Sequence, residues 1–176
     1  EQLIMRFCGV TRNDMLLFPA RPVTGAQAES VRQGTARRNS GEPLQYILGE
    51  WEFYGLRMKV NENCLIPRPD TELVAERAIT ELKKMPKKAE FRCVDLCTGS
   101  GCIAAAVMSH VKNASFTLVD ISKSALDIAK ENMELNGLLT RTTLVEADVM
   151  SEIFHSEKFD LVTANPPYIP SEVMQT

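Results

Sequence analysis

The chain has 176 residues, of which 44% are hydrophobic and 24% are charged, so it can form one substantial globular domain with a small additional lobe. Its formal net charge of −3 does not favour non-specific binding to nucleic acid, and no apolar run is long enough to span a bilayer. The spacing of the five cysteines matches no zinc motif, which predicts reduced thiols, a reducing compartment and no metal site.

Residues 1–48 are predicted to form part of a small helical lobe. The sequence EQLIMRFCGV at the start is apolar on a helical period. A second helix is expected to begin after the capping residue Thr24 and to end at Gly41. Because the chain begins with Glu1 rather than Met, we expect the natural N-terminus to be missing.

Residues 49–66 are predicted to form a β-hairpin that links the lobe to the main domain. Aromatic and β-branched residues lie on both sides of residues 61–63, where we place the turn.

The main domain is expected to extend over residues 67–176 and to begin with a helix. Asp70 or Thr71 can cap this helix, and Pro86 stops it. Its buried face is expected to carry Val74, Ala78 and Leu82.

Four short strands then alternate with helical stretches. This alternation predicts an α/β domain with a parallel sheet, right-handed crossovers and helices on both faces of the sheet. The helices between the strands are expected to begin near Cys102 and Ser122, and Gly137 should end the second one. The expected strands are residues 91–96, 115–120, 142–148 and 158–165.

A turn with two glycines follows the first of these strands, in the sequence VDLCTGSGCIA. Gly99 and Gly101 allow positive φ angles and a close approach of the backbone to a ligand, and the next helix begins with free N–H groups. Asp120 ends the second strand, where its carboxylate can accept hydrogen bonds from ribose hydroxyls, and Asp148 ends the third strand at the same edge. This pattern predicts a nucleoside-containing cofactor, whereas the two glycines alone would indicate only a turn.

The turn does not by itself select the cofactor. Gly99, Gly101 and Ala104 also satisfy the looser dinucleotide pattern GxGxxA, so a nicotinamide-dependent oxidoreductase is an alternative. Two features favour a different ligand. Asp95, which we place inside the turn, would repel a pyrophosphate but suit a cation. A dehydrogenase also gives no reason for the Asn-Pro-Pro-Tyr sequence further along the chain.

The sequence Asn165–Pro166–Pro167–Tyr168 follows the fourth strand, at the same edge of the sheet. The two prolines fix φ and lack N–H groups, so their carbonyls are held in place and free to accept. The side-chain carbonyl of Asn165 and a fixed backbone carbonyl can together bind a planar –NH2 group, and Tyr168 offers a flat surface beside it. Such a site can aim an amide nitrogen at an electrophile without a strong general base.

These motifs resemble those of the class I S-adenosylmethionine-dependent methyltransferases that modify planar amino groups. VDLCTGSG, Asp120 and NPPYI carry the general likeness, and residues 42–60 and 64–76 narrow it to the release factor glutamine methyltransferase family, HemK/PrmC. The likeness covers about residues 41–172. It implies an enzyme with a Rossmann-like sheet, which transfers a methyl group from S-adenosyl-L-methionine to the side-chain amide of the Gln in the Gly-Gly-Gln loop of class I peptide chain release factors.

The same resemblance assigns roles to the residues of the site. Asp120 would hold the ribose, and Asp148 with Val149 would flank the adenine. Asn165 would contact both the cofactor and the substrate. The residues that would surround the methionine part of the cofactor are Cys97, Thr98, Gly99, Ser100 and Gly101. The residues that would bind and orient the substrate amide are Asn165, Pro166, Pro167 and Tyr168.

The chain departs from the family pattern in three respects. The family usually has glycine at the position of Cys97, and it often has a larger residue at that of Val149. Class I methyltransferases also continue for three more strands, so we expect the chain to be truncated after its fourth strand.

Two other functions stay open on the sequence. An adenine-specific nucleic-acid amino-methyltransferase uses a related clamp, but a base-flipping enzyme should show a basic groove and a target-recognition region. A truncated chain could also bind the cofactor without turnover. We expect a monomer that acts on release factors in a bacterial cytoplasm, or alternatively in an organelle matrix, with no membrane partner and no nucleic-acid substrate.

Overall fold

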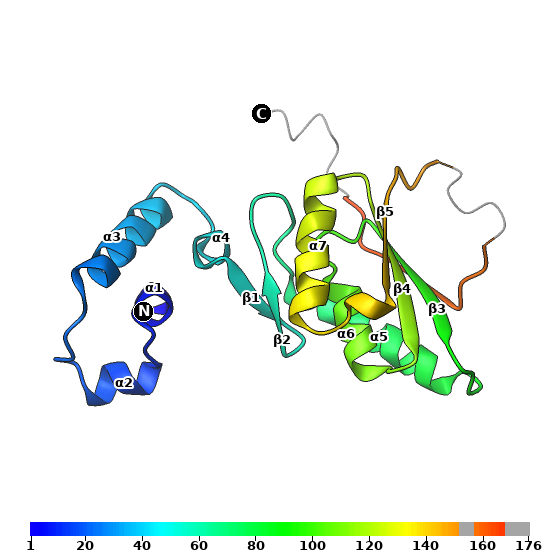
Figure 1. The fold of residues 1–176 in the computed structure, drawn as a ribbon, viewed down its shortest axis with the longest axis horizontal. Coiled ribbons are helices and arrows are strands. Elements are labelled where there is room, and N and C mark those ends of the chain that lie inside the picture. Colours follow the sequence, from blue (N-terminus) through cyan, green and yellow to red (C-terminus); the bar gives the residue numbers. More distant parts are fainter. Residues whose placement is uncertain (152–156, 168–176) are drawn as a thin grey trace. The chain divides into compact units, whose positions relative to one another are not determined.

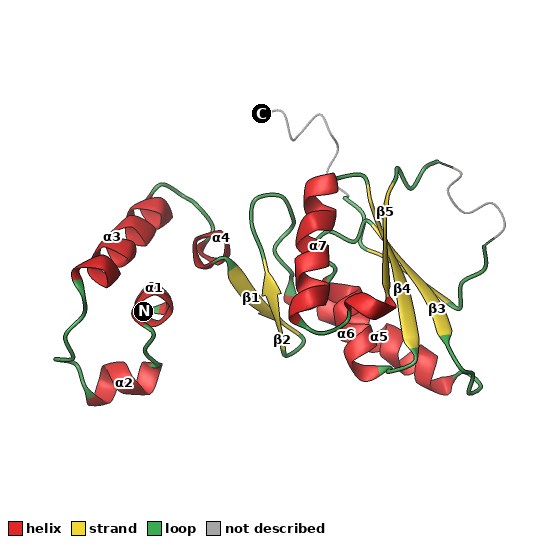
Figure 2. Ribbon diagram, viewed as in Figure 1, coloured by secondary structure: helices red, strands yellow, loops and turns green. Residues whose placement is uncertain are grey.

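The structure, a computed structural model, describes residues 1–151 and 157–167. The chain divides into two compact units, Glu1–Gly49 and Glu50–Thr176, which are drawn in Figures 1 and 2. Within the described ranges, the helices are all too short or too polar to cross a membrane.

The first unit is helical, as the sequence predicts. Thr24 caps its longest helix through a capping box, in which the Thr24 hydroxyl accepts from the Gln27 N–H and the Gln27 side chain accepts from the Thr24 N–H. Gly34 lets two helices approach closely, because a Cβ there would come within 2.9 Å of the Phe7 ring. The helices of this unit are α1 (Gln2–Cys8), α2 (Arg12–Leu17), α3 (Gly25–Asn39) and α4 (Leu44–Leu48).

The second unit begins with an antiparallel hairpin of β1 (Glu50–Phe53) and β2 (Leu56–Lys59). The placement of its turn at residues 61–63 is wrong, because those residues follow β2. Tyr54 and Gly55 form the turn, with φ angles of 51° and 75°. Two successive positive φ angles match the right-handed twist of the paired strands, which is why a two-residue turn closes the hairpin here.

The helix α5 (Pro69–Lys84) begins two or three residues earlier than expected, because its N-cap residue is Arg68 and not Asp70 or Thr71. Proline is well suited to the first helical position, because its fixed φ is helical and its missing N–H is not needed there. Val74, expected on the buried face, is 37% exposed. The buried residues of this helix are Thr71, Ala75, Ala78, Ile79 and Leu82.

The central sheet has four parallel strands in the order β5-β4-β3-β6, which confirms the predicted fold class. The helix α6 begins at Cys102 and Ser122 caps α7, as expected. The elements are β3 (Phe91–Leu96), α6 (Cys102–His110), β4 (Ala114–Asp120), α7 (Lys123–Leu135), the short 3-10 helix η1 (Leu139–Arg141), β5 (Thr142–Glu146) and β6 (Leu161–Ala164).

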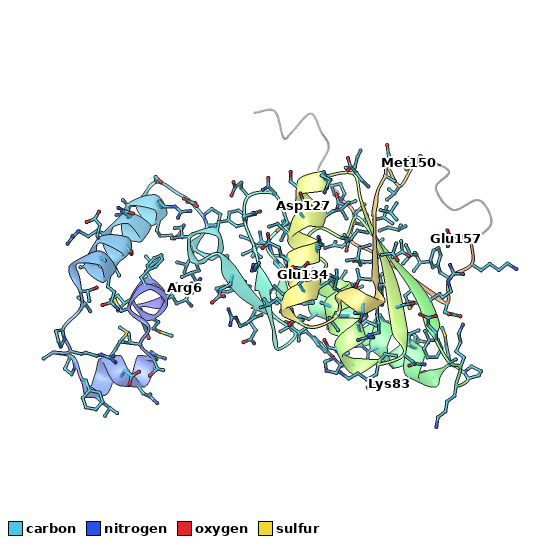
Figure 3. All side chains as sticks on the ribbon, in the orientation of Figure 1. Arg6, Lys83, Asp127, Glu134, Met150 and Glu157 are labelled. Atoms are coloured by element: carbon cyan, nitrogen blue, oxygen red, sulfur yellow. The ribbon has the colours of Figure 1, made fainter. Side chains whose placement is uncertain are left out.

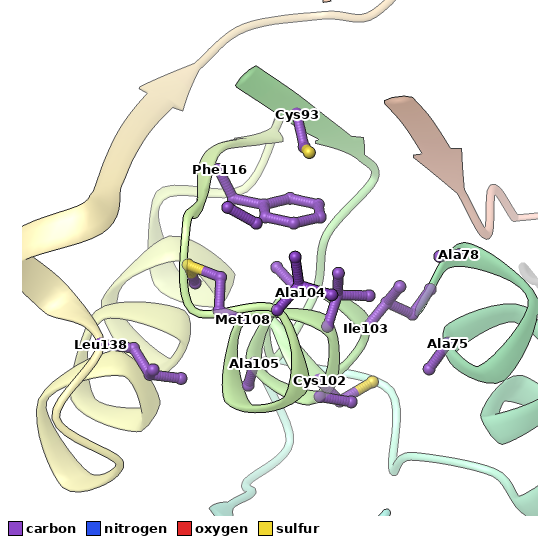
Figure 4. Packing of buried hydrophobic residues seen from close by; sticks show 14 of the residues in the cluster. Ala75, Ala78, Cys93, Cys102, Ile103, Ala104, Ala105, Met108, Phe116 and Leu138 are labelled. Carbon is purple, nitrogen blue, oxygen red and sulfur yellow. The ribbon is translucent and has the colours of Figure 1, made fainter. Parts of the chain in front are cut away.

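Helices cover one face of this sheet in the part of the chain that the structure describes. Figure 4 shows Cys93 and Phe116 pointing from the strands onto α6, with α5 beside it, and Met133 of α7 belongs to the same core. The expectation of helices on both faces is therefore wrong for the described residues. Two right-handed crossovers that step in the same direction, from β3 to β4 to β5, place their helices on the same face.

The opposite face of the sheet carries polar side chains near the start of β3–β5 and valines such as Val119 and Val145 near their ends. Arg92 and Thr117 are among the residues that line a shallow pocket there, and Arg92 pairs with Glu157 at 2.7 Å. The apolar core thus lies between the sheet and α5–α7, and the hairpin contributes Phe53 and Met58 to it.

Candidate active site

The turn after β3 combines three residues with positive φ angles. Cys97, Gly99 and Gly101 have φ of 54°, 54° and 76°. A Cβ on Gly101 would lie 2.8 Å from the terminal methyl of Met133, so α6 and α7 pack closely around it. A Cβ on Gly99 would meet no atom of the described residues within 4 Å. Gly99 therefore faces open space, where a ligand can approach the backbone.

Hydrogen bonds fix the shape of this turn. The Thr98 N–H donates to the Val119 carbonyl of the neighbouring strand at 3.0 Å, and the Gly101 N–H donates to the Thr98 carbonyl at 2.9 Å. Thr98 and Ser100 are buried, so the turn is part of the core rather than a loose loop.

Asp120 lies against the turn, although it is 21 residues from it in the sequence. Asp120 is the last residue of β4. Its carboxylate accepts hydrogen bonds from the Gly99 N–H at 2.9 Å and from the Ser122 N–H at 3.0 Å. A carboxylate has further lone pairs, so these bonds leave acceptor capacity for hydroxyl groups of a ligand. Ile121 next to it is 69% exposed and offers an apolar surface that the sequence analysis did not identify.

Asp148 and Val149 lie beyond the end of β5, not within it. The strand ends at Glu146, which pairs with Asp120 of β4. Asp148 is exposed, and its carboxylate accepts from the Met150 N–H at 2.9 Å, whereas Val149 is half-buried. Figure 3 shows Met150 near the end of β5, where it is 88% exposed.

Asn165 follows β6 directly and lies next to the glycine turn. Leu96 of β3 pairs with Ala164 of β6 on one side and with Val119 of β4 on the other. The residues that come next, Cys97, Asn165 and Asp120, therefore lie at the same edge of the sheet. Asn165 is half-buried, and Pro166 and Pro167 are exposed. Tyr168 lies outside the described residues.

Asp95 is placed differently from what the sequence suggested. It lies within β3, beneath the turn, and is fully buried. Its carboxylate accepts from the hydroxyls of Thr98 and Thr163, each at 2.6 Å. Burial raises the pKa of Asp95 to about 6, although the two hydroxyls act in the opposite direction and Asp120 adds to the rise.

The site carries negative charge. Burial raises the pKa of the half-buried Cys97 thiol, and the carboxylates of Asp120, Asp95 and Asp148 raise it further. Three carboxylates that act on one thiol produce a local potential that favours a cationic ligand over a pyrophosphate. Cys102, the first residue of α6, has a pKa raised to about 12, because it is buried and lies near Asp95.

Asn132 of α7 is hydrogen-bonded to the glycine turn, and the sequence motifs did not identify it. It is fully buried, and its amide donates to the Ser100 carbonyl at 2.9 Å and to the Lys59 carbonyl at 3.0 Å. Its side-chain oxygen accepts from the Lys59 N–H at 2.6 Å. One side chain therefore joins the turn, α7 and the hairpin. An asparagine in an amphipathic helix carries no signal of such a role, because its partners are distant in the sequence.

Comparison with known proteins gives matches along nearly the whole chain. A family model described as "Methyltransferase small domain" matches residues 79–175, and one described as "PrmC N-terminal domain" matches residues 1–49. The release factor glutamine methyltransferase of Chlorobaculum tepidum is 39% identical over 175 residues, which cover 97% of this chain and 60% of that protein. The one from Caulobacter vibrioides is 37% identical, over 96% of this chain and 57% of that protein. The chain thus spans less than two thirds of the length of these relatives.

Solved structures share the fold. The SAM-dependent methyltransferase from Agrobacterium tumefaciens matches with a TM-score of 0.57 and 20% identity, over 67% of this chain and 40% of that one. The N-terminal domain of human METTL16, in complex with SAH, matches with a TM-score of 0.54 and 18% identity, over 94% of this chain and 66% of that one. The family matches, the relatives and the fold confirm the resemblance found in the sequence: the chain belongs to the methyltransferase small domain family and is similar over nearly its whole length to release factor glutamine methyltransferases.

Proposed function

We propose that this chain carries the catalytic core of a protein-(glutamine-N5) methyltransferase. Its methyl donor is S-adenosyl-L-methionine. Its acceptor is the side-chain amide nitrogen of the Gln in the Gly-Gly-Gln motif of class I peptide chain release factors. The relatives named for this activity are bacterial, and we infer that the protein works in the bacterial cytoplasm.

One observation supports this function most strongly. The strand β3 pairs with β4 on one side and with β6 on the other, so the glycine turn has Asp120 and Asn165 as neighbours. A cofactor held by the turn would therefore lie beside an amide clamp.

The residues of the turn fit a cationic nucleoside cofactor. The open space at Gly99 admits the ligand, and Asp120 has acceptor capacity for ribose hydroxyls. We assign the adenine side to Asp148 and Val149 and the methionine side to Cys97–Gly101. When bound, S-adenosylmethionine would supply an activated methyl group on a sulfonium centre, whose positive charge suits the carboxylates around Cys97.

The clamp is formed by the residues that follow β6. The side-chain carbonyl of Asn165 and the backbone carbonyl of Pro166 would accept the two N–H groups of the substrate amide. Pro167 would hold this geometry, and Tyr168 would pack against the planar group. An amide nitrogen is a weak nucleophile, so fixing its hydrogens and aiming its lone pair is the main contribution that these residues make. The nitrogen loses a proton after it gains the methyl group, so no strong base is needed beforehand.

We assign the regions of the chain accordingly. Residues 1–48 would be part of a lobe that contacts the release factor, residues 49–66 the hairpin linker, and residues 67–176 the cofactor-binding domain. We expect the protein to act as a monomer. The net charge of −3 argues against a duplex nucleic acid as substrate, because affinity for DNA depends on cationic contacts to phosphates.

The test is methyl transfer from radiolabelled S-adenosylmethionine. Three acceptors are compared: a class I release factor, its variant with the Gly-Gly-Gln glutamine changed to alanine, and duplex DNA. Label on the wild-type factor alone supports the proposal, and label on DNA would instead show an adenine amino-methyltransferase. Binding of S-adenosylmethionine without transfer to any acceptor would show that this chain binds the cofactor but is not catalytic.

The same assay tests the clamp. Asn165→Ala removes the side-chain carbonyl that would bind the substrate amide, so turnover should fall by about a hundredfold or more. The dissociation constant of S-adenosylmethionine, measured by calorimetry, should change much less. Loss of cofactor binding with normal residual turnover would show that Asn165 has a different role.

A further inference from the structure

A buried carboxylate joins the glycine turn to β6, the strand that leads into Asn165. Asp95 accepts from Thr98 through one carboxylate oxygen and from Thr163 through the other, each at 2.6 Å. Thr98 belongs to the glycine turn, and Thr163 lies two residues before Asn165. All three side chains are buried, with exposed fractions of 6% for Thr98, 0% for Asp95 and 5% for Thr163. We call these three residues the Asp95 bridge.

Packing alone does not explain this arrangement. Burying a carboxylate is costly unless it is hydrogen-bonded, and apolar residues of similar size would fill the same space without that cost. Among the described residues, the titratable groups that interact with Asp95 are the carboxylate of Asp120 and the thiols of Cys97 and Cys102, and none of them is a cation that would offset its charge. The two hydroxyls therefore provide its specific stabilisation, and they come from the glycine turn and from β6, the strand that leads into Asn165.

We propose that Asp95 is a positioning residue that, through Thr98 and Thr163, fixes the glycine turn relative to the Asn165 clamp. This inference rests on the proposed function, in which the turn holds the methyl donor and the clamp holds the acceptor nitrogen. The backbone ladder between β3 and β6 aligns the strands only as far as Leu96 and Ala164. Asp95 and Thr163 face each other within this ladder, and the Asp95 bridge extends the link to Thr98, beyond the end of β3.

The bridge should act on turnover rather than on binding. Donor and acceptor atoms must meet in a narrow range of distance and angle, and a small misplacement costs rate without removing a binding contact. Thr163→Val keeps the β-branched shape and removes only the hydroxyl. We expect kcat for methyl transfer to fall by about tenfold or more, and we expect the KM for the release factor and the Kd for S-adenosylmethionine to stay within about twofold.

Two variants serve as controls. Thr163→Ser keeps a hydroxyl and should restore most of the lost turnover. Thr117→Val makes the same chemical change on β4, on the face of the sheet opposite α5–α7, and should leave kcat unchanged. An equal effect of Thr163→Val and Thr117→Val would overturn the proposal.

A second measurement does not depend on catalysis. In carboxyl carbon NMR of the full chain, Thr163→Val should raise the pKa of Asp95, because it removes a hydrogen bond to the ionised form. The amide signals of Gly99 and Gly101 should also shift, and Thr117→Val should move neither quantity. A shifted pKa with unchanged kcat would reduce the Asp95 bridge to a structural contact and contradict positioning.

The two proposals can fail separately. If the wild-type chain transfers no methyl group to any acceptor, the proposed function fails, and the amide signals then decide the inference alone. In that case, unchanged Gly99 and Gly101 signals in Thr163→Val would show that β6 does not position the turn. Displaced signals would show that it does.

Discussion

At the scale of single residues, the glycine turn depends on where a Cβ atom can be accommodated. Gly99 and Gly101 have similar positive φ angles but opposite surroundings. The first faces open space, and the second packs against Met133, Ala129 and Leu118. Alanine at each position therefore tests two separate properties, ligand access and core packing.

Gly101→Ala should destabilise the fold more, and Gly99→Ala should impair the site more. The Cβ at Gly101 would meet Ala129 at 3.3 Å in addition to the left-handed strain, so we expect a loss of about 2 kcal/mol in the free energy of unfolding. Gly99→Ala should cost about 1 kcal/mol from backbone strain alone. Its Kd for S-adenosylmethionine should nevertheless rise by about tenfold or more, because the Cβ enters the space left for the ligand. Urea unfolding and calorimetry measure the two effects, and the reverse ranking would disprove the assignment.

Cys97 is a non-glycine residue in a left-handed conformation, with φ of 54°. Cys97→Gly should relieve this strain and raise the free energy of unfolding by about 0.5–1 kcal/mol, after the greater chain entropy of glycine is taken into account. Cys64→Gly is the control, because Cys64 is a buried cysteine without a positive φ, and this variant should lose stability. A destabilised Cys97→Gly variant in urea unfolding would show that the thiol contributes more than the strain costs.

Local signals in the sequence predict part of this site. Gly99, Gly101 and Asn165 follow strands and Asp120 ends one, and parallel strands bring their carboxyl ends to one edge of the sheet. The hydrogen bond between Asp95 and Thr163 joins residues 68 apart in the sequence, and neither residue carries a local sign of it. The predictable residues are therefore those whose place follows from the strand pattern, and the missed ones are those defined by a distant partner.

At the scale of elements, the hairpin is attached to the domain by α7. Asn132 makes three hydrogen bonds to Lys59 and Ser100 in a fully buried position. Glu131, the preceding residue, makes an exposed ion pair with the Lys59 ammonium at 2.8 Å. The two residues link the same elements through a buried and an exposed contact.

Asn132→Ala should lower the free energy of unfolding by about 3 kcal/mol, because it leaves buried N–H and carbonyl groups without partners. Glu131→Ala should cost well under 1 kcal/mol, since an exposed ion pair contributes little. Urea denaturation of both variants measures the difference. If both variants lost equally little free energy of unfolding, water would be replacing the Asn132 side chain. The attachment of the hairpin would then depend on the packing of Phe53 and Met58.

The sequence predicts the elements better than their boundaries. Alternating strand and helix patterns identify β3–β6 and α5–α7, because each pattern is set by local periodicity. The hairpin turn was misplaced because Tyr54 has a positive φ that its residue type does not favour. Helices on both faces were expected from alternation alone, whereas the face depends on the direction in which each crossover steps along the sheet.

At the scale of the whole molecule, the free energy of unfolding should depend on pH through two carboxylates, one with a raised pKa and one with a lowered pKa. The pKa of Asp95 is raised from its ordinary value of 3.8 to about 6 by burial. The pKa of Asp160 is lowered, chiefly by the Lys88 ammonium, which pairs with it at 2.6 Å. A raised pKa means that the folded state binds more protons than the unfolded state between the two values.

Asp95 should therefore make the chain less stable as pH rises from about 4 to about 6, by an amount on the order of 3 kcal/mol. Asp160 contributes in the other direction, since its stabilisation is lost as pH falls below about 4. Asp95→Asn should flatten the slope between pH 4 and 6 and leave the acid limb in place. Thermal unfolding across pH 3–8 for both proteins measures this, and identical slopes would show that Asp95 titrates normally.

The pairing of β3 with β6 also has a consequence for how the protein folds. The strands β3, β4 and β5 follow one another along the chain, but the neighbour of β3 on its other side lies 68 residues later. Non-local parallel pairs form slowly, because a long loop must close before the contacts that reward it. The site should therefore be completed in the last step of folding, when Thr163 reaches Asp95. In a refolding experiment, affinity for the methyl donor should appear with the slowest phase, after most of the helical signal has returned.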